Sequence, residues 1–439
     1  MTELTDPRAA DAMLVEVRGR LAAWLEDEAR QARFPGEDDQ EAYCEAMLEE
    51  ALAADASRRL AAGGTALGRW DEEAIRVHVR DGVFGAGVMQ PFLGGEWSDV
   101  LVSSELLVLI GATTGLKEYR PSPFVSDEEA VAWVRWQAQR HGRAHRFDTA
   151  HPKINLRLPD GTRLHAVMGF TRRCHVALRP HPRSLDRLDA LRDAGLTDRA
   201  LHAFSVAAVA ARVNVLVVGA TGAGKTTFVR ALLNEALATT SDRIVTIEED
   251  EELFLTAGPT RDVVAMTARE PNVHGAGAIT LDDCLREALR QRPDRIILGE
   301  ARPGGTEVLG ILLAMSSGHP GSFSTIHADT SGEAFQRLAL YAAMGGQTYT
   351  PEWVAQLIST AVDFVVHLGR TGDGRRVVTS VREVTGALDR AVLSSEVWAP
   401  DPQGRAVPHG PFTDRMVGRL EDAGFDLALR DKPDGWWDR

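Results

Sequence analysis

The sequence predicts an α/β protein whose main domain has a doubly wound parallel sheet, preceded by a smaller N-terminal α/β domain and a helical N-terminal extension. Continuous apolar runs such as NVLVVG (214–219) and DRIILGE (294–300) are typical of parallel strands that are buried on both faces. Helical stripes alternate with these runs from residue 185 onward, which indicates right-handed crossovers between parallel strands. Sheets of this kind bind ligands at the carboxyl ends of their strands.

The composition is that of a globular protein. With 439 residues, 44% of them apolar and 26% charged, the chain can form two or three domains with their own cores. Cys44, Cys174 and Cys284 form no CxxC pair, so buried thiols are expected rather than disulfides or a zinc site. The N-terminus lacks the basic and apolar regions of a signal peptide, and FSVAAVAA (204–211) is too short to span a bilayer, so a cytoplasmic protein is expected. The net charge of −14 counts against a general nucleic-acid binder, although a local basic channel stays open.

The first two segments differ in composition. Residues 1–82 are acidic and alanine-rich with apolar residues at helical spacing, which predicts a helical extension that packs or docks rather than catalyses. From residue 83 glycines and β-branched residues predict short strands, and LPDG (158–161) is a tight-turn signal between two alternating runs. We expect a small α/β domain over 83–184 that ends in a proline-rich hinge, RPHPRS (179–184).

The remaining chain divides into the main domain, expected over 185–370, and a C-terminal segment over 371–439. RIVTIEE (243–249) and GSFSTIHA (321–328) repeat the buried-strand pattern with helices between them. TGDG (371–374) predicts a hairpin turn, and a looser tail without obvious chemistry follows it.

A phosphate-binding loop is the most specific motif of the sequence. Residues 219–226, GATGAGKT, match GxxxxGK[ST], with a strand before them and a helix after them. Backbone N–H groups and the helix N-terminus can then surround a β-phosphate, while Lys225 reaches the β- and γ-phosphates and Thr226 binds Mg²⁺. An ordinary glycine-rich turn is the alternative, and a dinucleotide loop would need GxGxxG. The predicted ATP-binding residues are Gly219, Ala220, Thr221, Gly222, Ala223, Gly224, Lys225, Thr226 and Thr227.

Acids and histidines stand at the ends of the other predicted strands. Glu248 and Glu249 follow one buried strand and Glu300 follows another, where carboxylates can hold Mg²⁺ through water or orient the attacking water. His319 and His327 flank a third strand, and a neutral imidazole can sense or position a γ-phosphate. Residue type alone leaves structural roles open: a cap or ion pair for Glu300, and hydrogen-bonded structural histidines.

The order of these motifs resembles that of the type II/IV secretion ATPase superfamily, and within it the CpaF-like branch of tight-adherence and type IV pilus-like machines. The resemblance rests on the phosphate loop, TIEEDEEL (246–253), the stretch from MTARE to GEAR (266–302) and GHPGSFSTIHA (318–328). It extends from about residue 83 to about residue 368.

The resemblance implies a hexameric ring of two-domain subunits with a RecA-like P-loop NTPase core, which binds ATP and Mg²⁺ and moves pilin or another protein substrate with an inner-membrane platform protein. It implies peripheral membrane association through partners and no direct nucleic-acid contact. By position, Glu300 is the catalytic glutamate, Glu248 and Glu249 the acidic box, and His319 and His327 the histidine box. Arginines of the N-terminal domain face the γ-phosphate in this family, and Arg157, Arg163 and Arg179 are the candidates, with Arg269 and Arg290 as weaker ones. The implied catalytic residues are Lys225, Glu248, Glu249, Glu300, His327, Arg157 and Arg179, with His319 and Arg163 as nucleotide ligands and Thr226 and Glu300 as metal ligands.

Three departures from the family pattern bear on turnover. Glu249 stands where the family has aspartate, the segment after Glu300 is about two residues longer, and Asp282 stands where arginine is frequent. A RecA-like nucleic-acid motor and a nucleotide-binding scaffold with little turnover therefore remain as alternative functions.

Overall fold

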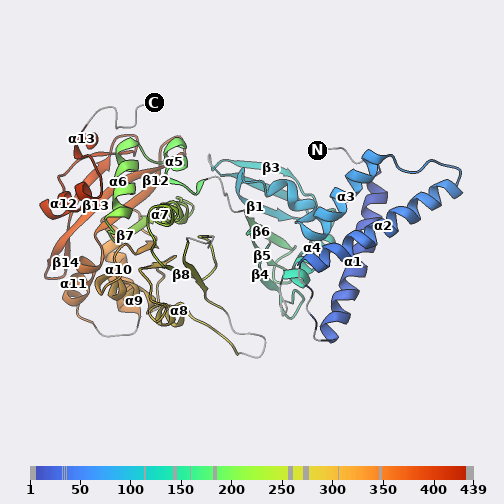
Figure 1. Cartoon of the computed structure of the whole chain (residues 1–439), viewed down its shortest axis with the longest axis horizontal. Coiled ribbons are helices and arrows are strands. Elements are labelled where there is room, and N and C mark those ends of the chain that lie inside the picture. Colours follow the sequence, from blue (N-terminus) through green and yellow to red (C-terminus); the bar gives the residue numbers. More distant parts are fainter. Residues whose placement is uncertain are drawn as a thin grey trace. The chain divides into compact units, whose positions relative to one another are not determined.

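A computed structural model gives the fold of the chain. It describes residues 6–31, 33, 35, 37–112, 115–141, 146–158, 160–180, 185–255, 261–269, 276–304, 306–345 and 349–431. The chain forms two compact units, one made mainly of the residues up to 182 and the other mainly of the residues from 183 onward (Figure 1). Each unit is described separately below.

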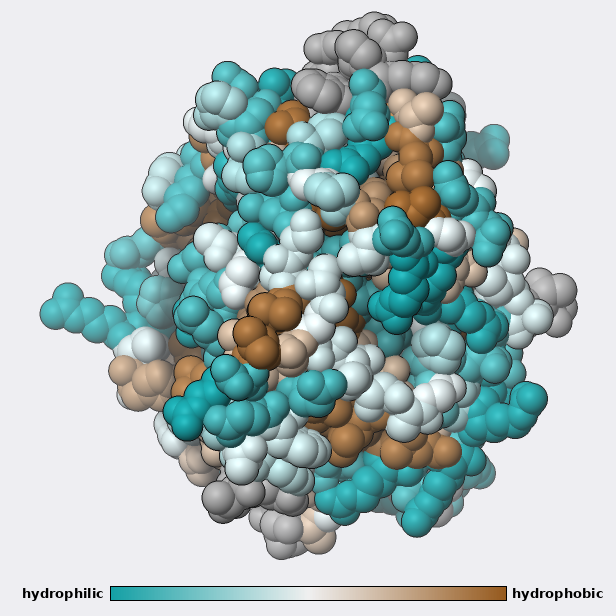
Figure 2. Space-filling view, turned by 90° about the vertical axis from the view of Figure 1, so that its left-hand side faces the viewer, coloured by the Kyte–Doolittle hydropathy of each residue, from teal (hydrophilic) through white to brown (hydrophobic). Residues whose placement is uncertain are grey.

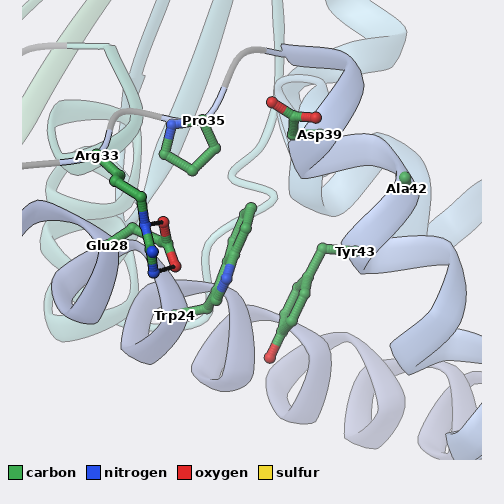
Figure 3. Close-up of a pocket in the computed structure, with 7 residues that line it drawn as sticks. All are labelled: Trp24, Glu28, Arg33, Pro35, Asp39, Ala42 and Tyr43. Carbon is green, nitrogen blue, oxygen red and sulfur yellow. Dashed lines mark hydrogen bonds and ion pairs between the residues drawn. The ribbon is translucent and has the colours of Figure 1, made fainter. Parts of the chain in front are cut away.

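The first unit begins with three helices, α1 (Pro7–Arg30), α2 (Glu37–Ala61) and α3 (Arg69–Phe84). Their apolar stripes face one another and bury Val17, Leu48 and Ile75 in a common core. Near the α1–α2 turn, Trp24 stacks on Tyr43 with ring centroids 4.5 Å apart, beside the pair of Arg33 with Glu28 (Figure 3).

An antiparallel sheet completes the first unit. Its strands are β1 (Trp97–Ser103), β2 (Leu106–Gly111), β3 (Lys117–Pro121), β4 (Lys153–Arg157), β5 (Arg163–Val167) and β6 (His175–Arg179), in the order β3-β2-β1-β6-β5-β4. The 3₁₀ helix η1 (Gly87–Phe92) precedes the sheet, and α4 (Asp127–His141) packs on its apolar face. β4 and β5 form the hairpin that the LPDG turn predicts, with Arg157 opposite Arg163.

The second unit is built on a sheet with the order β15-β14-β13-β12-β7-β11-β10-β8-β9. The strands are β7 (Val215–Gly219), β8 (Ile244–Glu248), β9 (Val263–Thr267), β10 (Arg295–Leu298), β11 (Phe323–Ile326), β12 (Phe364–Arg370), β13 (Arg376–Leu388), β14 (Ala391–Pro400) and β15 (Ala406–Pro408). The helices are α5 (Leu188–Asp193), α6 (Arg199–Ala210), α7 (Lys225–Thr239), α8 (Leu281–Ala288), α9 (Glu307–Ser316), α10 (Glu333–Met344), α11 (Pro351–Ala361), α12 (Asp414–Asp422) and α13 (Leu427–Arg430).

This sheet has a parallel part and an antiparallel part. β9, β8, β10, β11, β7 and β12 pair in parallel, whereas β13, β14 and β15 continue the sheet as an antiparallel meander. Helices cover both faces and enclose two separate apolar cores. The predicted α/β class is therefore confirmed, and the carboxyl ends of six neighbouring strands meet at one edge of the sheet.

On the face shown in Figure 2, apolar residues form small separate patches between hydrophilic ones. Within the described part of the chain, no helix combines the length and apolar character that a membrane span requires. Cys44, Cys174 and Cys284 are all buried free thiols, as expected.

Candidate functional site

The loop between β7 and α7 has a backbone that only glycine adopts easily. Gly219, Gly222 and Gly224 have φ angles of 150°, 74° and 100°. A Cβ atom on Gly219 would lie 2.3 Å from the carbonyl oxygen of Leu368 in the neighbouring strand β12. Residues 219–226 therefore form the compact loop that the motif predicts, at the carboxyl end of the central strand.

Lys225 is the first residue of α7, and its side chain folds back over the loop. It is 7% exposed, and its Nζ donates to the carbonyl oxygens of Gly219 (3.0 Å) and Ala220 (3.2 Å). Nζ also lies 3.1 Å from Nδ1 of His327, which follows β11. Because an ammonium group only donates, Nδ1 must accept, and the imidazole is then neutral with its proton on Nε2.

His327 connects this lysine to Glu300, which follows β10. Nε2 of His327 lies 2.8 Å from Oε1 of Glu300, so the ring donates to the carboxylate. The other oxygen of Glu300 accepts from Nε of Arg302 at 2.8 Å, and Arg302 also pairs with Glu249 beyond β8. Three neighbouring strand ends thus contribute one continuous chain of charged and polar groups.

Glu248 takes a different position from Glu249. It is 4% exposed, and its Oε1 accepts from the backbone N–H groups of Glu252 (2.9 Å) and Leu253 (3.1 Å). Its Cγ lies 2.9 Å from where a Cβ on Gly299 would stand, so only glycine fits beside it. Burial raises the pKa of Glu248 to about 7, against the lowering effect of these backbone hydrogen bonds. Glu248 holds the acidic turn in place, whereas Glu249 reaches the chain that contains Glu300.

Oxygen ligands suited to Mg²⁺ lie beside the loop. Thr226 donates its hydroxyl to Oε2 of Glu252 at 2.9 Å, and the Glu300 carboxylate belongs to the neighbouring polar chain, between His327 and Arg302. Hydroxyl and carboxylate oxygens are the ligands that Mg²⁺ prefers, so these residues fit the ion.

Comparison with known proteins shows the family of the chain. The sequence model of the family "Type II/IV secretion system protein" matches residues 125–398. The chain belongs to this family. A Mycobacterium tuberculosis (H37Rv) protein, described by its name as a conjugal transfer protein, is 35% identical over 328 residues, which cover 72% of this chain and 89% of that protein. The VirB11 protein of Agrobacterium fabrum is 35% identical over 175 residues, 39% of this chain and 48% of its own.

A solved structure is also similar. The VirB11 ATPase of the Brucella suis type IV secretion system is 25% identical, over 67% of this chain and 94% of its own, with a TM-score of 0.36. Membership of the family makes this chain an ATP-hydrolysing protein of the secretion and pilus-assembly class.

In this secretion ATPase, the three arginine candidates lie in one row of the first unit. Arg157, Arg163 and Arg179 are directly opposite one another on β4, β5 and β6, and Nε of Arg179 lies 3.7 Å from Oδ1 of Asp99 on β1. The weaker candidates belong to the second unit, where Nε of Arg269 donates to the carbonyl oxygen of Gly277 and Arg290 pairs with Glu287.

The structure separates His319 from His327. His319 precedes β11, and its Nδ1 donates to the carbonyl oxygen of Pro293, which precedes β10. Because β11 is parallel to β7, its amino end lies at the edge of the sheet opposite the phosphate loop. Four strand residues, Phe323–Ile326, are enough to place the two histidines at opposite edges.

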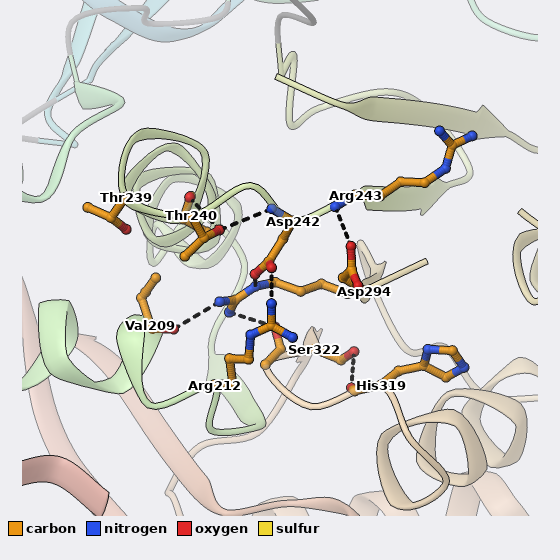
Figure 4. A network of polar contacts seen from close by, with 12 residues as sticks. Val209, Arg212, Thr239, Thr240, Asp242, Arg243, Asp294, His319 and Ser322 are labelled. Atoms are coloured by element: carbon orange, nitrogen blue, oxygen red, sulfur yellow. Dashed lines mark hydrogen bonds and ion pairs between the residues drawn. The ribbon is translucent and has the colours of Figure 1, made fainter. Parts of the chain in front are cut away.

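A buried ion pair occupies that opposite edge. Arg295, 0% exposed, donates from Nε to Oδ2 of Asp242 at 2.7 Å, and its other nitrogens donate to the carbonyl oxygens of Val209 (2.9 Å) and Gly321 (3.2 Å) (Figure 4). Arg212 also pairs with Asp242. This cluster joins α6, β10 and the segments that precede β8 and β11.

Three residues of the site region were missed in the sequence. Glu252 lies in an acidic run that is typical of a solvated surface, and Arg302 and Arg376 are single arginines in an arginine-rich chain. For Arg302, its place two residues after Glu300 was the one available signal. Nothing in the sequence indicated that Arg376 contacts the phosphate loop.

Proposed function

We propose that this chain is the Mg²⁺-dependent ATPase subunit of a homo-hexameric motor that powers protein secretion or pilus assembly at the cytoplasmic face of the inner membrane. Its partners would be an inner-membrane platform protein and a pilin or other protein substrate. The observation that carries the proposal is the chain from Lys225 through His327 to Glu300, which lies directly at a phosphate loop.

The residues of the loop have separate roles in the proposed reaction. Lys225 exchanges its loop carbonyls for the β- and γ-phosphates of ATP, and the backbone N–H groups of residues 222–226 surround the β-phosphate. Thr226 and Glu300 would hold Mg²⁺, which supplies positive charge to the phosphate oxygens when it is bound. Glu300 accepts hydrogen bonds from the attacking water, and His327 keeps the Glu300 carboxylate oriented towards the loop.

The arginine row of the first unit would supply further positive charge to the γ-phosphate. Guanidinium groups are always charged and bind phosphate oxygens with two donors at once, which suits a transition state with charge on three oxygens. The placement of Arg157, Arg163 and Arg179 in one row across three neighbouring strands supports this role, because adjacent guanidinium groups can bind one phosphate group together.

Replacement of the catalytic glutamate tests the function. We expect Glu300→Gln to release phosphate from Mg·ATP about 100-fold more slowly than wild type, because an amide is a poor base, while ATP still binds. Glu287→Gln on α8 removes a similar charge from an exposed carboxylate that pairs with Arg290, and it should keep the wild-type rate. Equal background rates for wild type and Glu300→Gln would overturn the motor function and leave a nucleotide-binding scaffold.

A further inference from the structure

An arginine from the β12–β13 hairpin contacts the phosphate loop from outside. Nε of Arg376 donates to the carbonyl oxygen of Gly222 at 2.8 Å, across 154 residues of sequence. Arg370, opposite Arg376 in the hairpin, approaches the same oxygen with Nη2 at 3.4 Å. The stem of Arg376 runs along the loop, because a Cβ on Gly224 would lie 3.5 Å from its Cδ.

The contact fixes the orientation of one peptide group. The carbonyl and the N–H of a trans peptide point in opposite directions, so an outward carbonyl at Gly222 directs the N–H of Ala223 inward. The structure agrees, because the Ala223 N–H donates across the loop to the carbonyl oxygen of Ala220 at 3.2 Å. Gly222 has φ of 74°, and a Cβ on it would have no atom within 4 Å, so side-chain packing does not restrain this peptide.

We propose that Arg376 is a positioning residue for nucleotide binding, which holds the Gly222–Ala223 peptide with its N–H turned toward the β-phosphate. Arg370 assists at a longer distance. The ligand class is a nucleoside di- or triphosphate, since only these carry the β-phosphate that the loop surrounds. The inference rests on the proposed function, because it requires that the loop bind nucleotide.

The position of the hairpin in the sheet makes this possible. β12 is parallel to β7 and pairs Leu368 with Gly219, so the strand that leads into the hairpin runs beside the strand that leads into the loop. The guanidinium also places a positive charge next to the phosphates, in addition to its hydrogen bond.

The test measures binding of ADP, ATP and AMP to the full chain with Mg²⁺ by calorimetry. Arg376→Gln should weaken ADP and ATP binding about tenfold each, since the loop loses a hydrogen bond from a charged donor, which is stronger than one between neutral groups. AMP, which lacks the β-phosphate, should be unaffected. In turnover assays KM should rise while kcat stays close to wild type, because the contact is the same in the ground and transition states. Arg376→Lys, which keeps a charged donor, should recover part of the affinity.

Arg375 supplies a matched control in the same hairpin. It pairs with Asp373 at 2.8 Å and is exposed, so Arg375→Gln removes the same charge without the loop contact and should bind ADP as wild type does. The inference is overturned if Arg376→Gln binds ADP like wild type, or if Arg375→Gln loses as much affinity. Failure of the wild-type chain to bind ADP would instead overturn the proposed function.

Discussion

The two edges of the parallel sheet each hold a buried cation beside carboxylates, but they differ in what surrounds the cation. At the amino edge, Arg295 is fully buried, and its partners are Asp242, which is 4% exposed, and two backbone carbonyls. At the carboxyl edge, Lys225 is held by carbonyls of a glycine-rich loop and by His327, whose side chain is 43% exposed.

The difference separates a structural cluster from a functional one. The hydrogen bonds of Arg295 lie within the protein interior, where removal of a partner leaves a charge without compensation. Two of the partners of Lys225, Ala220 and His327, reach solvent, so water or a phosphate can replace Lys225 at these groups. Burial alone therefore does not show whether a charged residue is structural or binds a ligand. That depends on whether a ligand can replace its hydrogen-bond partners.

Lys225→Ala gives the largest expected effect on function. We expect phosphate release to fall about 1000-fold and ATP affinity to fall with it, because the loop loses its one side-chain cation. The free energy of unfolding should fall less than for the amino-edge variant described next, since two of the three lost partners, Ala220 and His327, reach solvent. Phosphate release and chemical denaturation measure the two quantities, and a folded variant with wild-type ATP affinity contradicts the comparison.

Asp242→Ala is the corresponding change at the amino edge. It leaves Arg295 buried without its carboxylate, so the free energy of unfolding should fall by about 3 kcal/mol or more. Chemical denaturation measures this loss, and the folded fraction should still bind ADP with wild-type affinity. The double variant Asp242→Leu with Arg295→Met should recover part of the stability but not all, because two carbonyls lose their donor. A stable single variant would show that the pair is dispensable.

Glu248→Gln sharpens the comparison within the carboxyl edge. Burial raises the pKa of Glu248 from 4.5 in the unfolded chain to about 7 in the fold, so folded protein binds the proton more tightly and wild-type stability falls as pH rises between these values. Glutamine does not titrate, so the variant should gain about 2 kcal/mol relative to wild type across this range. Denaturation at pH 4.5 and pH 8 tests the slope, and parallel curves would contradict it.

Much of the fold could be predicted because its signals are local. The runs that became β7, β8, β10 and β11 are apolar throughout, and LPDG marks the β4–β5 turn. The strand β9 was not predicted, because VVAMT stands alone at a sheet edge. β14 and β15 were not predicted either, since a polar alternation reads as a loose tail until its pairing with β13 is known. The proposed division into four segments stays a prediction.

The site was predictable where motif and strand end coincide, as at Lys225 and Glu300. The position of His319 was not predicted, because it depends on the direction of β11 in the sheet. The parallel pairing of β11 with β7 fixes that direction. Arg302 and Arg376 depend on tertiary approach, and an isolated arginine carries no signal of its destination. The assignment to the tight-adherence branch stays a prediction. The hexamer and the membrane partner also stay predictions, because both involve further protein chains.

The close approach of Gly219 to strand β12 links two distant parts of the gene. With φ of 150° and the Leu368 carbonyl 2.3 Å from any added Cβ, codon 219 accepts no alternative while β12 keeps its place. A lineage that altered the start of the loop would need a compensating shift near codon 368 first. Residues 219 and 368, almost 150 positions apart, should therefore change together in evolution or stay unchanged.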